Sequence, residues 1–187
     1  MHLYDRNFLM EERQLIEGCI RGESRAQKAI YELHASTMMG VCMRYVCNRE
    51  TARDLLHDGF IKLFTKIHTY SGRGSFIGWM RRIFVTTALE HLRRNHLLRR
   101  MVEVEKMEHH DVEPDASCFE HLSADDLLGF IALLPHKCRT VFNMHAIEKY
   151  THVEIAKELE ISEGTSRSQY ARARQLLQKK VMEKIEK

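Results

Sequence analysis

The stretch from Tyr70 to Asn95 combines the residue types that contact single-stranded nucleic acid, because aromatic residues and arginines accompany a glycine-rich segment. Gly72, Gly74 and Ser75 interrupt the apolar pattern and allow turn conformations that display neighbouring side chains on a loop. Bases stack on aromatic rings for about 1–3 kcal/mol each, while cations follow the phosphates. The loop residues with this chemistry are Tyr70, Arg73 and Phe76. We therefore predict a loop that binds single-stranded nucleic acid.

A basic amphipathic helix is predicted directly after this loop. At about 100° per residue, one side carries Met80, Phe84, Thr87 and His91, and the opposite side carries Arg82, Thr86 and Arg93. We expect the first side to pack in a core and the second to face a polyanion. Simple burial is the alternative for the large aromatic residues, and it is favoured for both Trp79 and Phe84.

A second candidate surface lies near the C-terminus, where residues 151–181 predict two helices joined by a turn at residues 160–162. Thr151 and Ser162 are expected to cap the two helices, and Leu159, Ile161, Tyr170 and Leu177 to pack between them. In a helix-turn-helix, the second helix enters the major groove, where arginine reads guanine and hydroxyls bind phosphates. Its outer face would hold Arg167, Ser168, Arg172 and Arg174. A structural hairpin with a solvated basic face is the alternative.

Further amphipathic helices are predicted to position these surfaces. Apolar residues recur at spacings of three and four over residues 12–20, 25–47, 50–70, 124–134 and 141–147. Asn48 is expected to end the second of these helices, because asparagine tolerates the left-handed cap conformation. The polar face of residues 50–70 carries Arg53, Asp54, His57 and Asp58, and mixed-charge faces of this kind are most often only solvated. Gly59 is unexpected in the middle of this helix.

Residues 98–123 differ in character from the rest of the chain. They are rich in carboxylates, contain Pro114 and show no sustained apolar period, which predicts a flexible acidic linker. The segment contains His109, His110, Cys118 and His121. A zinc site is disfavoured because their spacing lacks two tight ligand pairs, although the sequence alone leaves metal binding by these residues open.

Composition limits the classes of protein to consider. The 187 residues are 44% hydrophobic and 29% charged with only two prolines, which favours an ordered helical chain of two small domains. We expect a cytoplasmic protein, because the sequence shows neither a signal peptide nor a membrane span. Five scattered cysteines predict buried reduced thiols. The net charge is only +3, so binding to a polyanion must rest on the distribution of charge. No phosphate loop, nucleophile with its base, or acidic metal cluster is evident, so neither an enzyme nor a cofactor is expected.

Two segments resemble one known family when they are taken together. ARDLLHDGFIKLF followed by SFIGWMRRIFVTTALEHLRR resembles the first module of bacterial extracytoplasmic-function (ECF) sigma factors. LLPHKCRTVFNMHAIEKYTHVEIAKELEISEGTSRSQYARARQLL is similar to their last module. The resemblance implies an all-α protein with a sigma-2-like helical bundle over residues 1–97, the flexible acidic linker over 98–123 and a sigma-4-like helix-turn-helix over 124–187.

The same resemblance implies a transcription initiation factor whose partners are core RNA polymerase, promoter DNA and an anti-sigma factor. It replaces the solvated-face interpretation with a polymerase-binding face at Asp54, Leu55, His57 and Asp58. It assigns the minus-ten element to Tyr70, Arg73, Phe76, Trp79, Arg82, Thr86, Glu90 and Arg93. It assigns the minus-thirty-five element to Ser162, Thr165, Arg167, Ser168, Ala171, Arg172 and Arg174. A free-standing helix-turn-helix regulator that acts without polymerase is the alternative.

The sequence departs from the family pattern at several of these positions. His57, Gly59, Thr86 and Glu90 replace the residues that are usual there, and so do Ser166 and Gln169 in the helix-turn-helix. Glu160 stands where the family usually has glycine, and a left-handed conformation would cost it about 1 kcal/mol. We therefore expect unusual promoter preferences at both elements.

Overall fold

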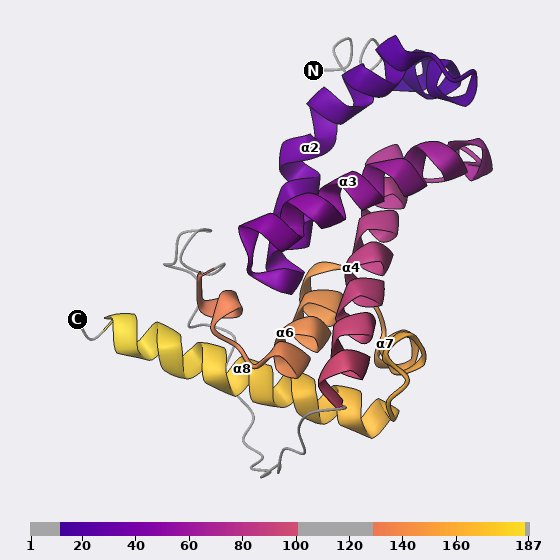
Figure 1. Cartoon of the computed structure of the whole chain (residues 1–187). Coiled ribbons are helices and arrows are strands. Elements are labelled where there is room, and N and C mark those ends of the chain that lie inside the picture. The colour runs from indigo at the N-terminus through magenta and orange to yellow at the C-terminus, as the bar shows by residue number, and fades with distance from the viewer. Residues whose placement is uncertain (1–11, 101–128, 186–187) are drawn as a thin grey trace. The chain divides into compact units, whose positions relative to one another are not determined.

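The computed structural model describes residues 12–100 and 129–185. All regular secondary structure in these two ranges is helical (Figure 1), which confirms the all-α expectation. The chain divides into two compact units, Met1–Leu98 and Arg99–Lys187, and each is described by itself below. Among the described helices, none is both long and apolar enough to cross a membrane.

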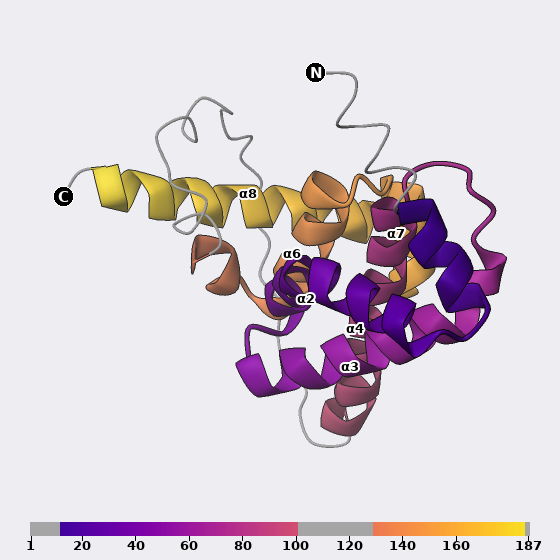
Figure 2. The same cartoon turned by 90° about the horizontal axis from the view of Figure 1, so that it is seen from above.

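The N-terminal unit contains a helix over residues 12–20, α2 (Ser24–Val46), α3 (Arg49–Lys66), the short 3₁₀ helix η1 (Ile67–Thr69) and α4 (Phe76–Arg100). α2 and α3 contact each other and lie side by side in both views (Figure 1, Figure 2). Cys47, with φ of 52°, ends α2 in the left-handed conformation, and Asn48 Oδ1 accepts a hydrogen bond from Thr51 N at 2.9 Å. The prediction that Asn48 ends α2 is therefore wrong, because its side chain caps the start of α3 instead.

An aromatic cluster forms the centre of this unit. The ring of Phe60 lies 4.7 Å from that of Tyr31, 5.9 Å from that of Phe64 and 5.1 Å from that of Phe84. A Cβ atom at Gly59 would lie 2.3 Å from Cε1 of Phe84. The glycine in the middle of α3 is thus explained, because only a residue without a side chain lets α3 approach the buried ring on α4.

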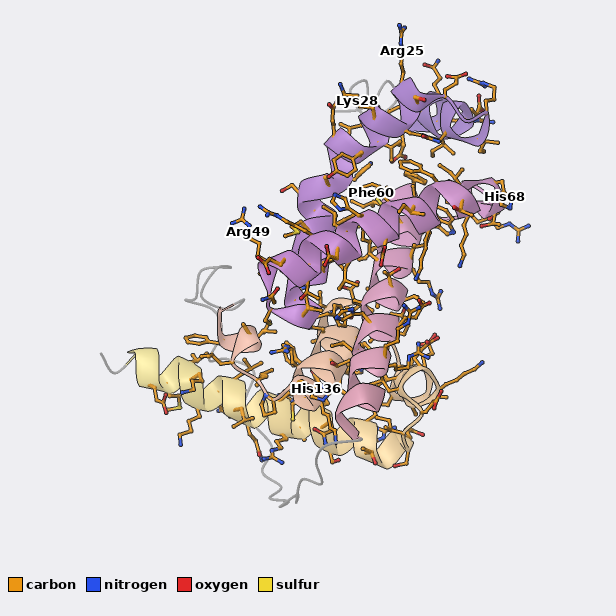
Figure 3. All side chains as sticks on the ribbon, in the orientation of Figure 1. Arg25, Lys28, Arg49, Phe60, His68 and His136 are labelled. Carbon is orange, nitrogen blue, oxygen red and sulfur yellow. The ribbon has the colours of Figure 1, made fainter. Side chains whose placement is uncertain are left out.

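Side chains on the helices of the N-terminal unit divide into an inner and an outer set. Figure 3 shows Phe60 among the helices, whereas Arg25, Lys28, Arg49 and His68 point outward and are exposed. On α4, Met80, Phe84 and Thr87 are buried and His91 is half-buried, which confirms the predicted core side of this helix. On the opposite side, Arg82 is exposed, and Thr86 and Arg93 are half-buried.

The C-terminal unit contains a helix over residues 129–132, α6 (His136–Phe142), the π-helix η3 (Asn143–Ile147), α7 (His152–Leu159) and α8 (Glu163–Ile185). Pro135 precedes α6. Proline is favoured at the start of a helix, because its φ is fixed and its missing N–H is not needed there. The long α8, yellow towards its end, contacts both α6 and α7 (Figure 1, Figure 2). The core consists of Ile131, Leu134, Cys138, Ala173 and Leu177. Of the residues predicted to pack between α7 and α8, Leu177 is fully buried, while Leu159, Ile161 and Tyr170 are half-buried.

The predicted linker begins inside a helix, because α4 continues through Arg100. The leucines and arginines at residues 97–100 are good helix formers, which explains the extension. Residues 101–123 lie outside the described ranges, and so do all four residues considered for zinc: His109, His110, Cys118 and His121.

The cysteines of the described ranges are reduced. Cys19, Cys42 and Cys138 are buried free thiols, as predicted, and Cys47 is half-buried. Burial raises the pKa of the Cys42 thiol to about 12, so this residue is a protonated core side chain.

Candidate nucleic-acid and protein interfaces

One face of α3 is polar and carries charges of both signs. Asp54, His57 and Asp58 are all exposed, in agreement with the sequence prediction. Leu55 is only 2% exposed, so the structure places it in the core rather than on this face, because it belongs to the apolar stripe of the helix. Ile61, one turn beyond His57, is 65% exposed, although the apolar pattern of the sequence did not single it out. The face therefore presents two carboxylates within two turns of an exposed isoleucine, a composition that suits a protein partner.

The glycine-rich segment before α4 forms a compact loop. Gly72 and Gly74 have φ values of 73° and 80°, which residues with a side chain rarely adopt. The prediction that these glycines allow turn conformations is therefore confirmed. The Tyr70 hydroxyl donates a hydrogen bond of 2.7 Å to Gly74 O and closes the loop. Burial, and secondarily the carboxylate of Glu12, raises the pKa of Tyr70, which keeps the hydroxyl protonated as a donor. Arg73 is exposed at the tip.

Three aromatic side chains meet where this loop joins α4. The ring of Phe76 lies 5.3 Å from that of Tyr70 and 5.8 Å from that of Trp79, with the latter pair stacked at 24°. Phe76 is 1% exposed, so its expected display on the loop is wrong. The reason is that Ser75 Oγ accepts from Gly78 N and starts the helix, which places Phe76 inside against His34 of α2. Tyr70 and Trp79 are half-buried and keep part of each ring accessible.

The predicted DNA-facing side of α4 is only partly free. Arg82 is exposed, and Thr86, Glu90 and Arg93 are half-buried. Glu90 Oε2 lies 2.6 Å from Nζ of Lys62 on α3, and the two side chains are 38% and 33% exposed. Sequence analysis did not consider Lys62, because its partner is 28 residues away and no local pattern connects them.

The helix-turn-helix forms as predicted. Thr151 and Glu154 make a reciprocal capping box at the start of α7. Glu160, with φ of 55°, ends α7 in the left-handed conformation. Ser162 Oγ accepts from Thr165 N at 2.9 Å and caps α8, and it also lies 2.8 Å from Thr165 Oγ1. Both predicted caps are therefore confirmed, and Glu160 has the left-handed conformation whose cost was considered for it.

The residues assigned to the outer face of α8 differ in accessibility. Arg167 and Arg172 are exposed, although Arg167 forms an ion pair with Glu163. Ser168 Oγ donates to Thr165 O, and Ala171 is half-buried. Arg174 is half-buried with its guanidinium 5.9 Å from the centre of the Tyr170 ring. Arg167 and Arg172 are therefore the more accessible of these arginines.

Ser166 and Gln169, the two departures from the family pattern in α8, are buried and satisfied within the protein. Ser166 Oγ hydrogen bonds to Nδ1 of His152 at 2.9 Å. The thiol of Cys138 donates to Gln169 Oε1 at 2.9 Å. Each polar residue thus has a polar partner on another helix, which is the usual requirement for burial. These side chains hold the helices together rather than contacting a ligand.

The imidazoles of His145 and His152 stack with ring centroids 4.2 Å apart. Burial, then the neighbouring His145 and Arg167, lowers the pKa of His152, and the carboxylate of Glu163 opposes the shift. Because the folded-state pKa lies below the ordinary value of 6.5, the unfolded chain binds the proton first as the pH falls. We therefore expect the C-terminal unit to lose stability as the pH decreases through about 6.5.

NMR of the full chain measures this expectation. The imidazole resonance of His152, assigned with a His152→Asn variant, should titrate with a midpoint below 6.5. Urea unfolding followed on the Tyr170 ring resonances should show lower stability at acid pH, with a weaker pH dependence in His152→Asn. An equal pH dependence in the variant would contradict the assignment.

Comparison with known proteins follows the division of the chain. The family model of sigma-70 region 2 matches residues 30–97, and that of sigma-70 region 4 matches residues 124–177. The RNA polymerase sigma-H factor of Pseudomonas aeruginosa is 26% identical over 179 residues, covering 90% of this chain and 93% of that protein. The ECF RNA polymerase sigma-E factor of Haemophilus influenzae is 25% identical over 182 residues, covering 92% and 96%.

A solved structure supports the fold. The sigma factor RpoE of Bartonella quintana, solved in complex with the anti-sigma factor NepR, matches with a TM-score of 0.51 at 17% identity. The match covers 83% of this chain and 96% of that one. Within residues 12–100 and 129–185, no group of three or more histidine, cysteine or acidic side chains could hold a metal ion.

Proposed function

This chain belongs to the ECF sigma factors, and from that premise we propose that it directs core RNA polymerase to promoters by reading two elements in different states. The N-terminal unit would bind the minus-ten element as melted single strand. The C-terminal unit would bind the minus-thirty-five element as duplex. The proposed division is residues 1–97 for the first module, 98–123 for the linker and 124–187 for the second module.

The observation that carries the proposal is the loop of residues 70–75 with its half-buried rings. Two positive-φ glycines and the bond from Tyr70 to Gly74 O fix the loop before any ligand is present. Extruding a base from the stack costs a few kcal/mol, so a preformed site lowers the total cost of capture. Tyr70 and Trp79 are proposed to stack on bases, and Arg73 to contact the sugar-phosphate backbone of the DNA. The buried Phe76 packs against both rings and supports them from the core side.

Polymerase docking is proposed for the polar face of α3. Asp54, His57 and Asp58 lie within two turns before the exposed Ile61 on the same helix, so the matching surface should carry cations beside an apolar contact. The proposed partner is the pair of clamp helices of the largest polymerase subunit. Leu55 holds α3 in place from the core side and does not contact the partner directly.

Duplex reading is proposed for the start of α8. Arg167 would exchange its ion pair with Glu163 for a guanine edge, and Arg172 would contact a phosphate. Ser162, Thr165, Ser168 and Ala171 lie along the same part of the helix and would position it on the backbone. Arg174 contributes charge nearby while packing on Tyr170. The NepR complex of the similar RpoE supports an anti-sigma factor as a regulator of this chain as well.

Reconstitution with core RNA polymerase tests the proposed function. The purified chain should co-elute with core enzyme on gel filtration, and the complex should open promoters selected from a random library. The alternative, a free-standing regulator, predicts specific duplex binding by the chain alone and no association with core. Specific binding without core, together with failure to co-elute, would reject the proposal.

A further inference from the structure

The ion pair between Lys62 and Glu90 connects the two proposed surfaces of the N-terminal unit. Lys62 follows the docking face on α3, one turn after Asp58, and Glu90 lies on the proposed DNA-facing side of α4. Their charged atoms are 2.6 Å apart.

Glu90 places a negative charge on the side of α4 that is predicted to face the negatively charged DNA. Arg82, Thr86 and Arg93 surround it in the helical pattern, and a strand of phosphates lying along them would pass the carboxylate. A like charge directly opposite a phosphate opposes binding. The ammonium group of Lys62 pairs with the Glu90 carboxylate and neutralises its charge. Because neither side chain is more than about two-fifths exposed, solvent ions screen this pair only partly.

We propose that Lys62 is a positioning residue for minus-ten recognition, and that Glu90 acts through it rather than by reading a base. The pair holds the Glu90 carboxylate towards α3 and away from the phosphate path, and it fixes the spacing of α4 from the docking helix. The inference rests on the proposed function, because it takes the Arg82 side of α4 as the path of the DNA strand.

The proposal predicts different effects on oligonucleotide binding when the charge of Lys62, the charge of Glu90 or both charges are removed. Lys62→Met leaves the Glu90 carboxylate unpaired beside the phosphates and should weaken binding about fivefold, because an unpaired charge at an interface is penalised. Glu90→Gln removes the offending charge and should stay within about twofold of the wild type or bind more tightly. Lys62→Met combined with Glu90→Gln should return to the level of Glu90→Gln alone, as expected for coupled neighbours.

The measurement is fluorescence anisotropy of a labelled single-stranded minus-ten oligonucleotide with the holoenzyme. Lys66→Met is the matched control, since Lys66 is an exposed cation one turn farther along α3. It should stay within about twofold of the wild type, because removing a distant cation has little effect through screening solvent. Affinity for core polymerase, measured separately, should be unchanged in all variants.

Three outcomes would overturn the inference. If Glu90→Gln weakens oligonucleotide binding as much as Lys62→Met, Glu90 contacts DNA directly. If the double variant remains as weak as Lys62→Met, the lysine itself binds phosphate. If Lys62→Met lowers only core affinity, or matches Lys66→Met, the pair has no role in minus-ten recognition. Failure of the wild-type holoenzyme to bind the oligonucleotide would instead reject the proposed function, and the inference with it.

Discussion

Reversing two carboxylates on α3, with Asp54→Lys and Asp58→Lys in one variant, should abolish detectable binding to core RNA polymerase. Both side chains are exposed and lie within two turns before Ile61, and in the proposed complex they meet a cationic surface. Truncating one member of a buried interfacial charge pair already costs about 2–5 kcal/mol, and reversal adds repulsion. A loss of at least about 100-fold in affinity is therefore expected, measured by competition with a labelled sigma factor for core enzyme.

A charge-matched control separates docking from general electrostatics. Glu17→Lys with Glu32→Lys makes the same change in net charge at exposed positions outside α3, where each glutamate forms only a weak surface pair. This control should bind core polymerase within about threefold of the wild type, because distant charges are screened. Equal losses in the two double variants, or wild-type binding by the α3 variant in its folded state, would disprove the docking assignment.

Features governed by neighbouring residues were predictable from the sequence. The caps at Thr151 and Ser162 and the loop at Gly72 and Gly74 depend on contacts within about four positions, and the core side of α4 is marked by apolar residues that repeat at spacings of three and four. Hydrophobic periodicity and capping chemistry report such contacts directly. For Glu160 the sequence indicated only a conditional cost of a left-handed turn, and the structure shows that the residue has this conformation.

Features that depend on contacts distant in sequence were missed or assigned the wrong role. Phe76 looked like a loop residue, but Ser75 starts α4 and turns the ring inward against α2. Glu90 looked like a DNA contact, but a lysine 28 residues earlier pairs with it. Ser166 and Gln169 looked like altered DNA readers, but each satisfies a polar group on another helix. Hydrophobic periodicity indicates which side of a helix is buried, but it does not indicate which residue of another helix packs against that side.

Gly59 is another residue whose role depends on a contact distant in sequence, and its substitution has the largest expected effect on stability. Glycine destabilises a helix interior by about 1 kcal/mol relative to alanine, so its presence in α3 looks unfavourable from the sequence. In the structure, a Cβ atom at this position would lie 2.3 Å from Cε1 of Phe84, and that ring is fully buried against Phe60. Gly59→Val should therefore destabilise the N-terminal unit by about 3 kcal/mol through overpacking. For a domain of this size, the shift in Tm would be about 15 °C.

Trp79 provides the readout, because it is the chain's single tryptophan and lies in α4, the helix that carries Phe84. Gly40→Val is the matched control, since an added Cβ atom at Gly40 of α2 meets nothing within 4 Å. It should change stability by less than about 0.5 kcal/mol, because valine and glycine differ little in helix propensity. Adding Phe84→Leu to Gly59→Val should produce a favourable coupling of about 1 kcal/mol or more, because the smaller side chain vacates the space that the new methyl groups need. Equal denaturation curves for Gly59→Val and Gly40→Val, or strict additivity with Phe84→Leu, would show that close approach of α3 to Phe84 is not the reason for the glycine.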